Sequence, residues 1–413
     1  TTRRISALAT ANYTWNDIYL ADASVRFDGS SEFGANQKWA PFFSGGLGVN
    51  VHNYAFLKGN KDINKLKVRA SYGRTGKVNF PAYAATTMYQ SLFDEWYITG
   101  YGAVLKALGN KDLSWEKTDK YNVGIETLFF NQRLTVEAEY YYEKTIDLIN
   151  DFGLSSTSGF SSYKNNMGEI LNKGFELQLR ADVFRDRNWT VSLWGNMAHN
   201  TNEILKISDS QKKYNERVAA FYQKEIDKQL TTNSSLSDAN YSVPIPQYAE
   251  GQSLTSIWAV RSLGIDPTTG KEIFLVTDKW DASQEVVVGN TEPKFNGSFG
   301  LNVTYKNWSL FASFLYEWGG QEYNQTLVDN VENANIKTGN VDLRVLTDRW
   351  KKPGDIAQFK DIKDSNLTTL PTSRFVQDKA LLHLNSLTIS YDFDREWIKK
   401  HLRMNMLRLE ANT

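Results

Sequence analysis

The sequence has 413 residues, 41% of them hydrophobic, and its 47 Lys and Arg residues balance its 47 Asp and Glu residues. This balance leaves no basic excess of the kind that nucleic-acid-binding proteins carry. The absence of cysteine excludes disulfide bonds, thiolate metal sites and a cysteine nucleophile, and it suits an oxidising compartment. The sequence contains no run of about 18 apolar residues, the length that a membrane-spanning helix needs. A membrane barrel is not excluded, because its strands alternate in polarity and show no such run.

Alternation of polar and apolar residues with a period of two is the dominant pattern along the chain. In LTVEAEYYYEK (134–144), Leu134, Val136 and Ala138 alternate with Glu137 and Glu139. Successive side chains of a strand point to opposite faces, so this pattern predicts a strand with two different faces. The pattern predicts about twelve strands, over residues 5–14, 18–28, 41–52, 65–74, 117–130, 133–149, 173–185, 189–203, 294–306, 307–319, 380–393 and 402–413.

The connections between these strands alternate between short and long. Short ones fall at 15–17, 131–132, 186–188 and 306–307, with 53–64 and 394–401 somewhat longer, whereas the long ones are 29–40, 75–116, 150–172, 204–293 and 320–379. Outer-membrane barrels place tight turns at the periplasmic end and long loops at the outer end. A tilted strand of about 9–11 residues crosses the hydrocarbon layer. The sequence therefore predicts an all-β, antiparallel transmembrane β-barrel.

The two faces of these strands are expected to meet different surroundings. Leu134, Val136 and Ala138 are predicted to face lipid, with Tyr140 and Tyr142 towards the interface. A soluble antiparallel sheet with one buried face would produce the same alternation, and strand length together with loop alternation favours the membrane. The polar side chains predicted to face a wet lumen are Glu137, Glu139, Glu143, Glu176, Arg180 and Asp182.

Several motifs, in order along nearly the whole chain, resemble the SusC/RagA-type TonB-dependent outer-membrane transporters. They are VRFDGSSEFGANQKWAPFFSGGLGV (25–49), KLKVRASYGRTGK (65–77), LGNKDLSWEKTDKYNVGIE (108–126), LTVEAEYYYEKTIDLI (134–149), NNMGEILNKGFELQL (165–179), GIDPTTGKEIF (264–274), RWKKPGD (349–355) and ALLHLNSLTISYDF (380–393).

The resemblance implies that the intact protein is a barrel of about 22 strands whose lumen is blocked by a plug. This chain would be the C-terminal part of that barrel. Residues 1–413 are expected to form part of that single barrel domain, with the plug domain and the TonB box outside the sequence. It also implies import of oligosaccharides or peptides, coupled to the inner-membrane TonB complex, with a SusD-like surface lipoprotein as a lid. The expected location is the bacterial outer membrane, among its lipids and with the long loops extracellular. No cofactor and no nucleic acid are expected.

Catalytic and metal sites have weak support in the sequence. The four histidines have no metal-ligand spacing, and SGGLG (44–48) lies within a predicted strand, where glycine marks a bend or close packing. Glu137 and Glu139 could suggest a glycosidase pair, but acids lining a polar barrel account for them without chemistry. Two rivals to a transporter are a glycosidase and a soluble or surface β-rich protein that binds glycans without transporting them.

Binding residues are expected in the long loops. RFDGSSEFG, within residues 25–49, combines turn-forming residues and is expected to fix the rim of the barrel. A charged helix is predicted over 211–230, where Tyr214, Val218 and Phe221 form a stripe that would either contact the lid lipoprotein or belong to an ordinary solvated helix. Aromatic faces suit both sugar rings and peptide side chains. The substrate-binding candidates in the loop at 91–108 are Phe93, Trp96, Tyr97 and Tyr101.

Overall fold

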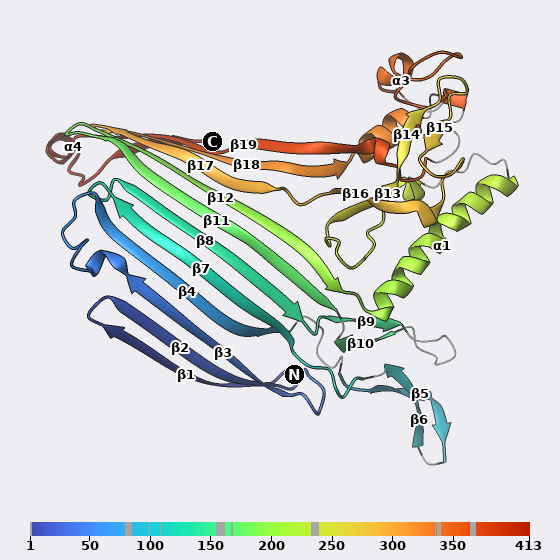
Figure 1. The fold of residues 1–413 in the computed structure, drawn as a ribbon, viewed down its shortest axis with the longest axis horizontal. Helices are drawn as coiled ribbons and strands as arrows, with labels where there is room; N and C mark the ends of the chain where they lie inside the picture. Colours follow the sequence, from blue (N-terminus) through green and yellow to red (C-terminus); the bar gives the residue numbers. More distant parts are fainter. Residues whose placement is uncertain are drawn as a thin grey trace. The chain divides into compact units, whose positions relative to one another are not determined.

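The computed structural model describes residues 2–78, 85–98, 100–107, 109–153, 162–166, 168–232, 239–334, 336, 340–363 and 369–413 (Figure 1). The chain separates into two compact units. The first, here named the sheet unit, comprises Thr1–Leu205, Lys294–Trp318 and Ala380–Thr413. The second, named the loop unit, comprises Lys206–Pro293 and Gly319–Lys379.

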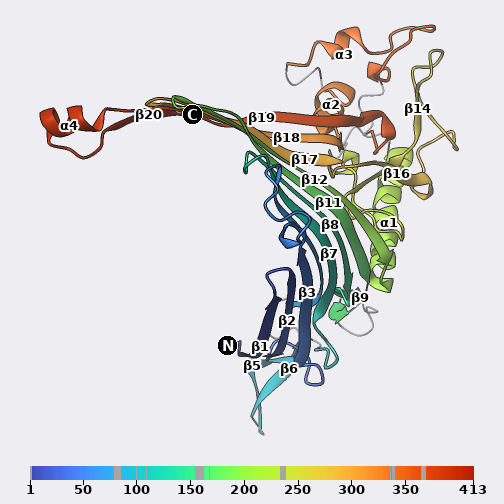
Figure 2. The same ribbon diagram turned by 60° about the vertical axis from the view of Figure 1, so that its left-hand side comes forward.

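Twelve strands form one sheet and follow one another in chain order, as both ribbon views show (Figures 1 and 2). This confirms the prediction of an all-β, antiparallel fold with about twelve strands. The strands are β1 (Arg4–Trp15), β2 (Tyr19–Ser30), β3 (Trp39–Asn50), β4 (Ile63–Lys77), β7 (Glu116–Phe129), β8 (Leu134–Ile146), β11 (Glu169–Arg185), β12 (Trp189–Lys206), β17 (Phe295–Tyr305), β18 (Trp308–Tyr323), β19 (Val376–Asp392) and β20 (Arg408–Asn412).

Short connections join alternate pairs of strands at one edge of the sheet, here named the turn edge. Residues in the left-handed backbone region make these reversals, among them Asn16 (φ 52°), Asn131 (φ 55°) and Lys306 (φ 51°). Helix α4 (Arg395–Leu402) lies in the predicted connection between β19 and β20, and the prediction of a strand over 402–413 was wrong for its first part, because β20 begins only at Arg408. Asp394 caps this helix by accepting a hydrogen bond from the backbone N–H of Trp397 at 2.9 Å.

The register of the strands separates two faces of the sheet. Glu137 pairs with Glu126 across β7 and β8, and Glu139 pairs with Glu176 across β8 and β11, so these residues share one face, the polar face. Leu134, Val136 and Ala138 belong to the opposite, apolar face, which is exposed at many large residues. Among them are Leu47, Val68, Val123, Ile125, Leu179, Leu193 and Phe299.

Aromatic rings form two rows on the apolar face. Near the turn edge, the rings of Trp15 and Tyr19 stack with centroids 5.5 Å apart, and those of Trp189 and Tyr305 lie 4.2 Å apart. Towards the other edge, contacts run from ring to ring across four neighbouring strands. The members of this second run are Phe43, Tyr72, Tyr121 and Tyr142.

The long connections contain small sheets and helices that the sequence analysis did not predict, apart from the helix over 211–230. That helix is confirmed as α1 (Asp209–Thr232), which begins with a capping box in which Ser208 and Gln211 bond reciprocally. None of the helices in the described part is long and apolar enough to span a membrane. The additional strands pair as β5 (Met88–Tyr97) with β6 (Gly100–Ala107), β9 (Ile149–Gly153) with β10 (Ser162–Asn166), β13 (Ser256–Val260) with β16 (Glu285–Asn290), and β14 (Ser262–Ile265) with β15 (Glu272–Phe274). The remaining helical turns are η1 (Val51–Asn53), η3 (Ala239–Ser242), η4 (Ala282–Gln284), α2 (Gln325–Leu327), η5 (Val328–Glu332), α3 (Arg344–Thr347) and η7 (Ser373–Phe375).

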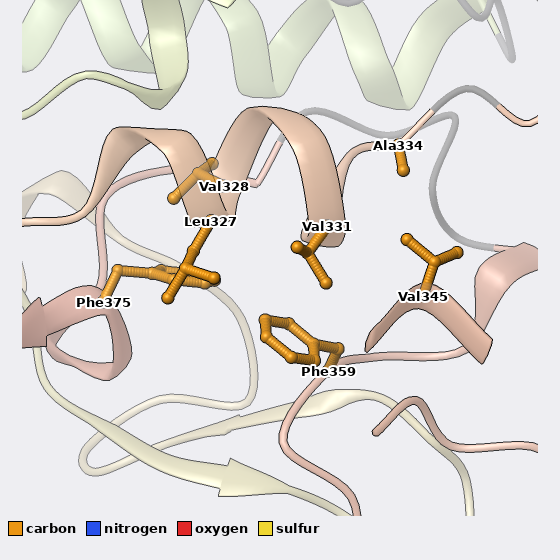
Figure 3. Close-up of a cluster of buried hydrophobic side chains, with 7 residues drawn as sticks. All are labelled: Leu327, Val328, Val331, Ala334, Val345, Phe359 and Phe375. Atoms are coloured by element: carbon orange, nitrogen blue, oxygen red, sulfur yellow. The ribbon is translucent and has the colours of Figure 1, made fainter. Parts of the chain in front are cut away.

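The loop unit has a hydrophobic core of its own. One cluster gathers side chains from α2, η5, α3 and η7, and Figure 3 shows them converging on the ring of Phe359. A second cluster packs α1 against the small sheets. The first cluster consists of Leu327, Val328, Val331, Ala334, Val345, Phe359 and Phe375, and the second of Val218, Tyr222, Tyr241, Val260, Trp280 and Leu370.

The segment after β2 is held against residues 110–115 within the sheet unit. The rings of Phe33 and Trp115 stack with centroids 4.3 Å apart, and the backbone N–H of Gly34 donates to the carbonyl of Leu113 at 3.0 Å. A Cβ atom on Gly34 would lie 2.0 Å from the carbonyl oxygen of Lys111, so only glycine fits here. The contact explains the RFDGSSEFG motif as a structural clamp between two connections.

The substitution Gly34→Ala is expected to loosen this clamp at a cost of about 1–3 kcal/mol, because two backbone segments would have to move apart. Hydrogen exchange of the amides at 110–115 should speed up accordingly. The matched control is Gly45→Ala in β3, where the nearest atom to a new Cβ lies 3.7 Å away. Unchanged exchange in the Gly34→Ala protein would contradict the clamp.

Candidate functional site

The polar face of the sheet carries the charged residues that the sequence analysis assigned to a lumen. Two hollows of about 380 Å³ each lie on this face, and Glu139 and Glu176 line both. Glu137 lines the first and Glu143 the second. Arg180 pairs with Thr135, and Asp182, two residues further along β11, accepts a hydrogen bond from the Ser192 hydroxyl at 2.7 Å. That this face borders a lumen stays a prediction.

Ion pairs tie neighbouring strands together on the polar face. Lys120 contacts Glu143 at 2.7 Å, and Arg69 pairs with Glu139, two strands away. Within the described residues, Glu137 and Glu176 have no such cationic partner. The polar face therefore presents carboxylates without a cationic partner beside amides such as Gln178, a surface suited to binding polar groups.

The apolar face ends at a row of ion pairs. Beyond the rings of Tyr72, Tyr121 and Tyr142, the same strands carry the pair Arg74–Asp119, whose closest atoms lie 2.7 Å apart. Lys144–Glu169 (2.8 Å) and Lys117–Asp147 (3.1 Å) lie in the same region. Along β4, β7 and β8 the apolar face thus changes from aliphatic to aromatic to ionic, which is the profile of a membrane–water interface.

The hairpin of β5 and β6 carries two of the predicted binding residues. Phe93 and Tyr101 lie with ring centroids 5.5 Å apart, edge to face, and both are exposed. Tyr89 and Ile98 are exposed on the same hairpin. The side chains of Trp96 and Tyr97 lie outside the described residues. The structure therefore brings together Phe93 and Tyr101 as a solvent-facing aromatic pair.

The stripe on α1 is explained by packing within the loop unit. Val218 is only 4% exposed, and Tyr214 and Phe221 are partly buried against the same cluster. A buried Val218 is not offered to a partner, so the proposed contact through this residue is corrected. Sequence reasoning missed Tyr222, which is fully buried and whose hydroxyl donates to the carbonyl of Val243 at 2.8 Å. Its place beside Phe221 on the stripe was the available signal.

A buried arginine joins three parts of the loop unit. Arg374 contacts Glu272 of β15 at 3.0 Å and Glu332 of η5 at 2.6 Å, and it donates to the carbonyl of Gln358 at 2.7 Å. Burial opposes the charge of Arg374, but the two carboxylates outweigh it and hold the pKa of the guanidinium above its usual range. The network fixes β15, η5 and η7 relative to one another.

Glu285 is the loop-unit carboxyl with the most perturbed acidity. Burial raises its pKa to about 7, although a hydrogen bond from the Gln247 amide lowers it in part. Its Oε1 atom is buried and has no hydrogen-bond partner among the described residues. The carboxyl is therefore protonated in the folded unit under mildly acidic conditions. Among described residues, no group of three or more His, Cys, Asp or Glu could hold a metal ion.

Comparison with known proteins identifies the family. Residues 1–354 match the profile of the family described as TonB dependent receptor-like, beta-barrel. The chain belongs to the TonB-dependent receptor-like β-barrel family. Members of this family are outer-membrane proteins, and the resemblance found in the sequence motifs is confirmed.

Individual relatives of the chain are also TonB-dependent receptors. TonB-dependent receptor P39 of Formosa agariphila is 26% identical over 100% of this chain and 42% of that protein. TonB-dependent receptor SusC of Bacteroides thetaiotaomicron is 31% identical over 49% of this chain and 21% of that protein. The structure of the RagAB peptide transporter aligns with 100% of this chain and with 43% of the transporter chain. The TM-score is 0.80 and the sequence identity is 23%, which shows the same fold. The chain spans about two fifths of the length of the curated relatives that match it throughout.

Replacing Arg374 by methionine in this receptor barrel is expected to destabilise the loop unit by about 3–5 kcal/mol, because two carboxylates would remain buried without their cation. Urea titration followed by limited proteolysis of the loop unit measures the change. Arg344→Met is the matched control, since its pair with Asp342 is exposed to water and contributes little. Equal effects of the two substitutions would contradict the role assigned to Arg374.

The stability of the loop unit is expected to fall as the pH rises from about 4.5 to about 7. In this range the folded unit keeps a proton on Glu285 that the unfolded chain has lost. The free energy of unfolding therefore falls by roughly 3 kcal/mol across the range. Glu285→Gln should remove this component, because the amide stays neutral at every pH. Hydrogen exchange of β13 and β16, corrected for intrinsic rates at pH 5 and pH 8, gives the comparison. An identical pH dependence in the variant would refute the assignment.

Proposed function

We propose that this chain is the C-terminal part of the wall of an outer-membrane importer, coupled through TonB to the inner membrane and working with a SusD-like lid lipoprotein. Its cargo would be oligosaccharides or peptides. The chain itself would supply the wall and the outer loops, and capture by the lid followed by rearrangement of a plug would move the cargo. No covalent chemistry is needed for this function.

The two-faced sheet carries the proposal. Trp308 and Trp318 are ten residues apart on β18 and mark the two ends of its apolar face. A strand rises about 3.3 Å per residue, so a tilt of about 40° brings this span to about 25 Å, the height of an outer-membrane apolar band. The opposite face is lined by carboxylates and amides, as a water-filled interior requires. A soluble sheet has no reason to expose such a band.

The edges of the sheet support membership in a larger barrel. Within the described residues, β1 and β20 stand at the two ends of the sheet and do not pair with each other. Unpaired backbone groups in hydrocarbon cost several kcal/mol each. Further strands, up to a total of about 22 on the family resemblance, would complete the pairing.

The cargo class rests on two kinds of support. RagAB, whose structure shares this fold, is a peptide transporter. The first hollow on the polar face combines carboxylates with the amides of Asn196 and Gln178, which can bond to peptide groups and to sugar hydroxyls alike. Both cargo classes therefore stay within the proposal.

Purification of the native assembly in detergent, followed by mass spectrometry of what accompanies it, tests the function. A lipoprotein partner with bound peptides or oligosaccharides is the expected result, and the bound molecules identify the cargo. A protein that stays monodisperse in water without detergent would instead support the soluble glycan-binding alternative and contradict the importer.

The double substitution Phe93→Ala and Tyr101→Ala is expected to lower uptake of that cargo on the order of tenfold, because apolar faces of the cargo lose an aromatic surface. Tyr89→Ala on the same hairpin is the matched control, since Tyr89 is exposed but has no place in the ring pair. Uptake of labelled cargo by cells with equal surface levels of each variant is the measurement. Unchanged uptake would show that Phe93 and Tyr101 do not contribute to cargo binding.

A further inference from the structure

The connection between β19 and β20 differs from the other turn-edge connections because it contains helix α4. The helix and the residues after it expose Trp397 (49%), Leu402 (45%), Met404 (51%) and Met406 (71%). Ile398 is fully buried, so the helix is packed down on one side. A short helix with this much exposed apolar surface calls for something that covers it.

Basic side chains accompany this apolar surface. Lys399 and Lys400 lie in the last turn of α4, and Arg403 follows it in the left-handed conformation that ends the helix. All three are exposed, and in the part of the chain that the structure describes no carboxylate forms an ion pair with them. Cations at the last turn also suit the negative end of the helix dipole. Charge therefore favours an anionic neighbour.

The apolar surface of α4 continues the aromatic row of the sheet. Ring contacts lead from Trp308 to Tyr391 (4.8 Å between centroids), on to Phe393 (5.0 Å) and then to Trp397 (6.5 Å). Trp397 stacks in turn on His401, with centroids 5.0 Å apart. Trp308 lies opposite Tyr305 of the turn-edge row in the strand register, so ring contacts lead from a neighbour of that row onto the helix.

We propose that α4 and residues 403–406 lie in the headgroup layer at the turn edge, where Lys399, Lys400 and Arg403 bind the phosphates of anionic glycerophospholipids. Trp397, Leu402 and Met404 would enter the boundary between headgroups and acyl chains. An amphipathic segment with aromatic and basic residues is the type that binds in the plane of such an interface. The inference rests on the proposed function, because it needs the apolar face of the sheet to lie in lipid.

The 413 residues contain no cysteine, so a cysteine introduced among them is the one thiol of this chain and can carry a reporter. Met404→Cys, labelled with a fluorophore, reports on α4, and Val123→Cys reports on the apolar face, where Val123 is 54% exposed. Each labelled protein is placed in phosphatidylcholine nanodiscs that contain spin-labelled phosphatidylglycerol or spin-labelled phosphatidylcholine. Quenching by the first relative to the second measures the preference for the anionic lipid.

We expect quenching at position 404 to favour phosphatidylglycerol about fivefold or more, since each cation near a membrane surface adds attraction to anionic lipid. The variant Lys399→Gln with Lys400→Gln should lose most of this preference. The matched pair Lys351→Gln with Lys352→Gln, two exposed lysines of the loop unit, should keep it.

Equal quenching by the two lipids at position 404, or no quenching there while position 123 is quenched, would overturn the inference and leave the importer intact. A preference that both lysine variants reduce equally would also overturn it, because the effect would then follow total charge. Absence of quenching at both positions would overturn the proposed function together with the inference.

Discussion

The hydrogen-bonded register between neighbouring strands is the constraint on which the rest of the structure depends. Antiparallel ladders pair the backbone N–H and C=O groups of each strand with those of its neighbours, and in the described residues the outer edges of β1 and β20 are the ends of the sheet. The same register decides which side chains meet. A slip of one residue would move Glu137 and Glu139 to the apolar face and bring Val136 and Ala138 to the polar face. Ion pairs such as Lys120–Glu143 and ring contacts such as Tyr72–Tyr121 hold the register from opposite faces.

The loop unit is stabilised by different means. Its two hydrophobic clusters resemble the core of a small soluble domain, and the buried contacts of Arg374 join segments that are about a hundred residues apart in sequence. These contacts lie outside the sheet's hydrogen-bond ladders. Stability of the wall and stability of the loops therefore respond to different substitutions, and Glu285 gives the loop unit a pH dependence that is its own.

The twelve strands could be predicted from the sequence because alternation of polarity is a local pattern, and a sheet with one apolar and one polar face repeats it at every second residue. The start of the strand over 402–413 was misjudged because Leu402, Met404 and Met406 alternate with polar residues as in a strand, although α4 ends at Leu402 and β20 begins only at Arg408. The small sheets of the loop unit escaped prediction because strands as short as β15 depend on partners that fold against them. The carboxylates of the polar face could be predicted because alternate residues along a strand share one face. The burial of Val218 and Tyr222 could not be predicted, because it follows from packing in one cluster with Trp280 and Leu370, which are distant in the sequence.

The position of the two long insertions has a consequence for how much they can vary in length. Residues 206–293 leave β12 and return to β17, which pairs with β12 directly, and residues 319–379 do the same between β18 and β19. Lengthening a connection whose ends are already fixed costs little, since each doubling of loop length adds only about 0.6 kcal/mol of closure entropy. Changes in the length and sequence of these insertions therefore leave the pairing of the strands that carry them in place.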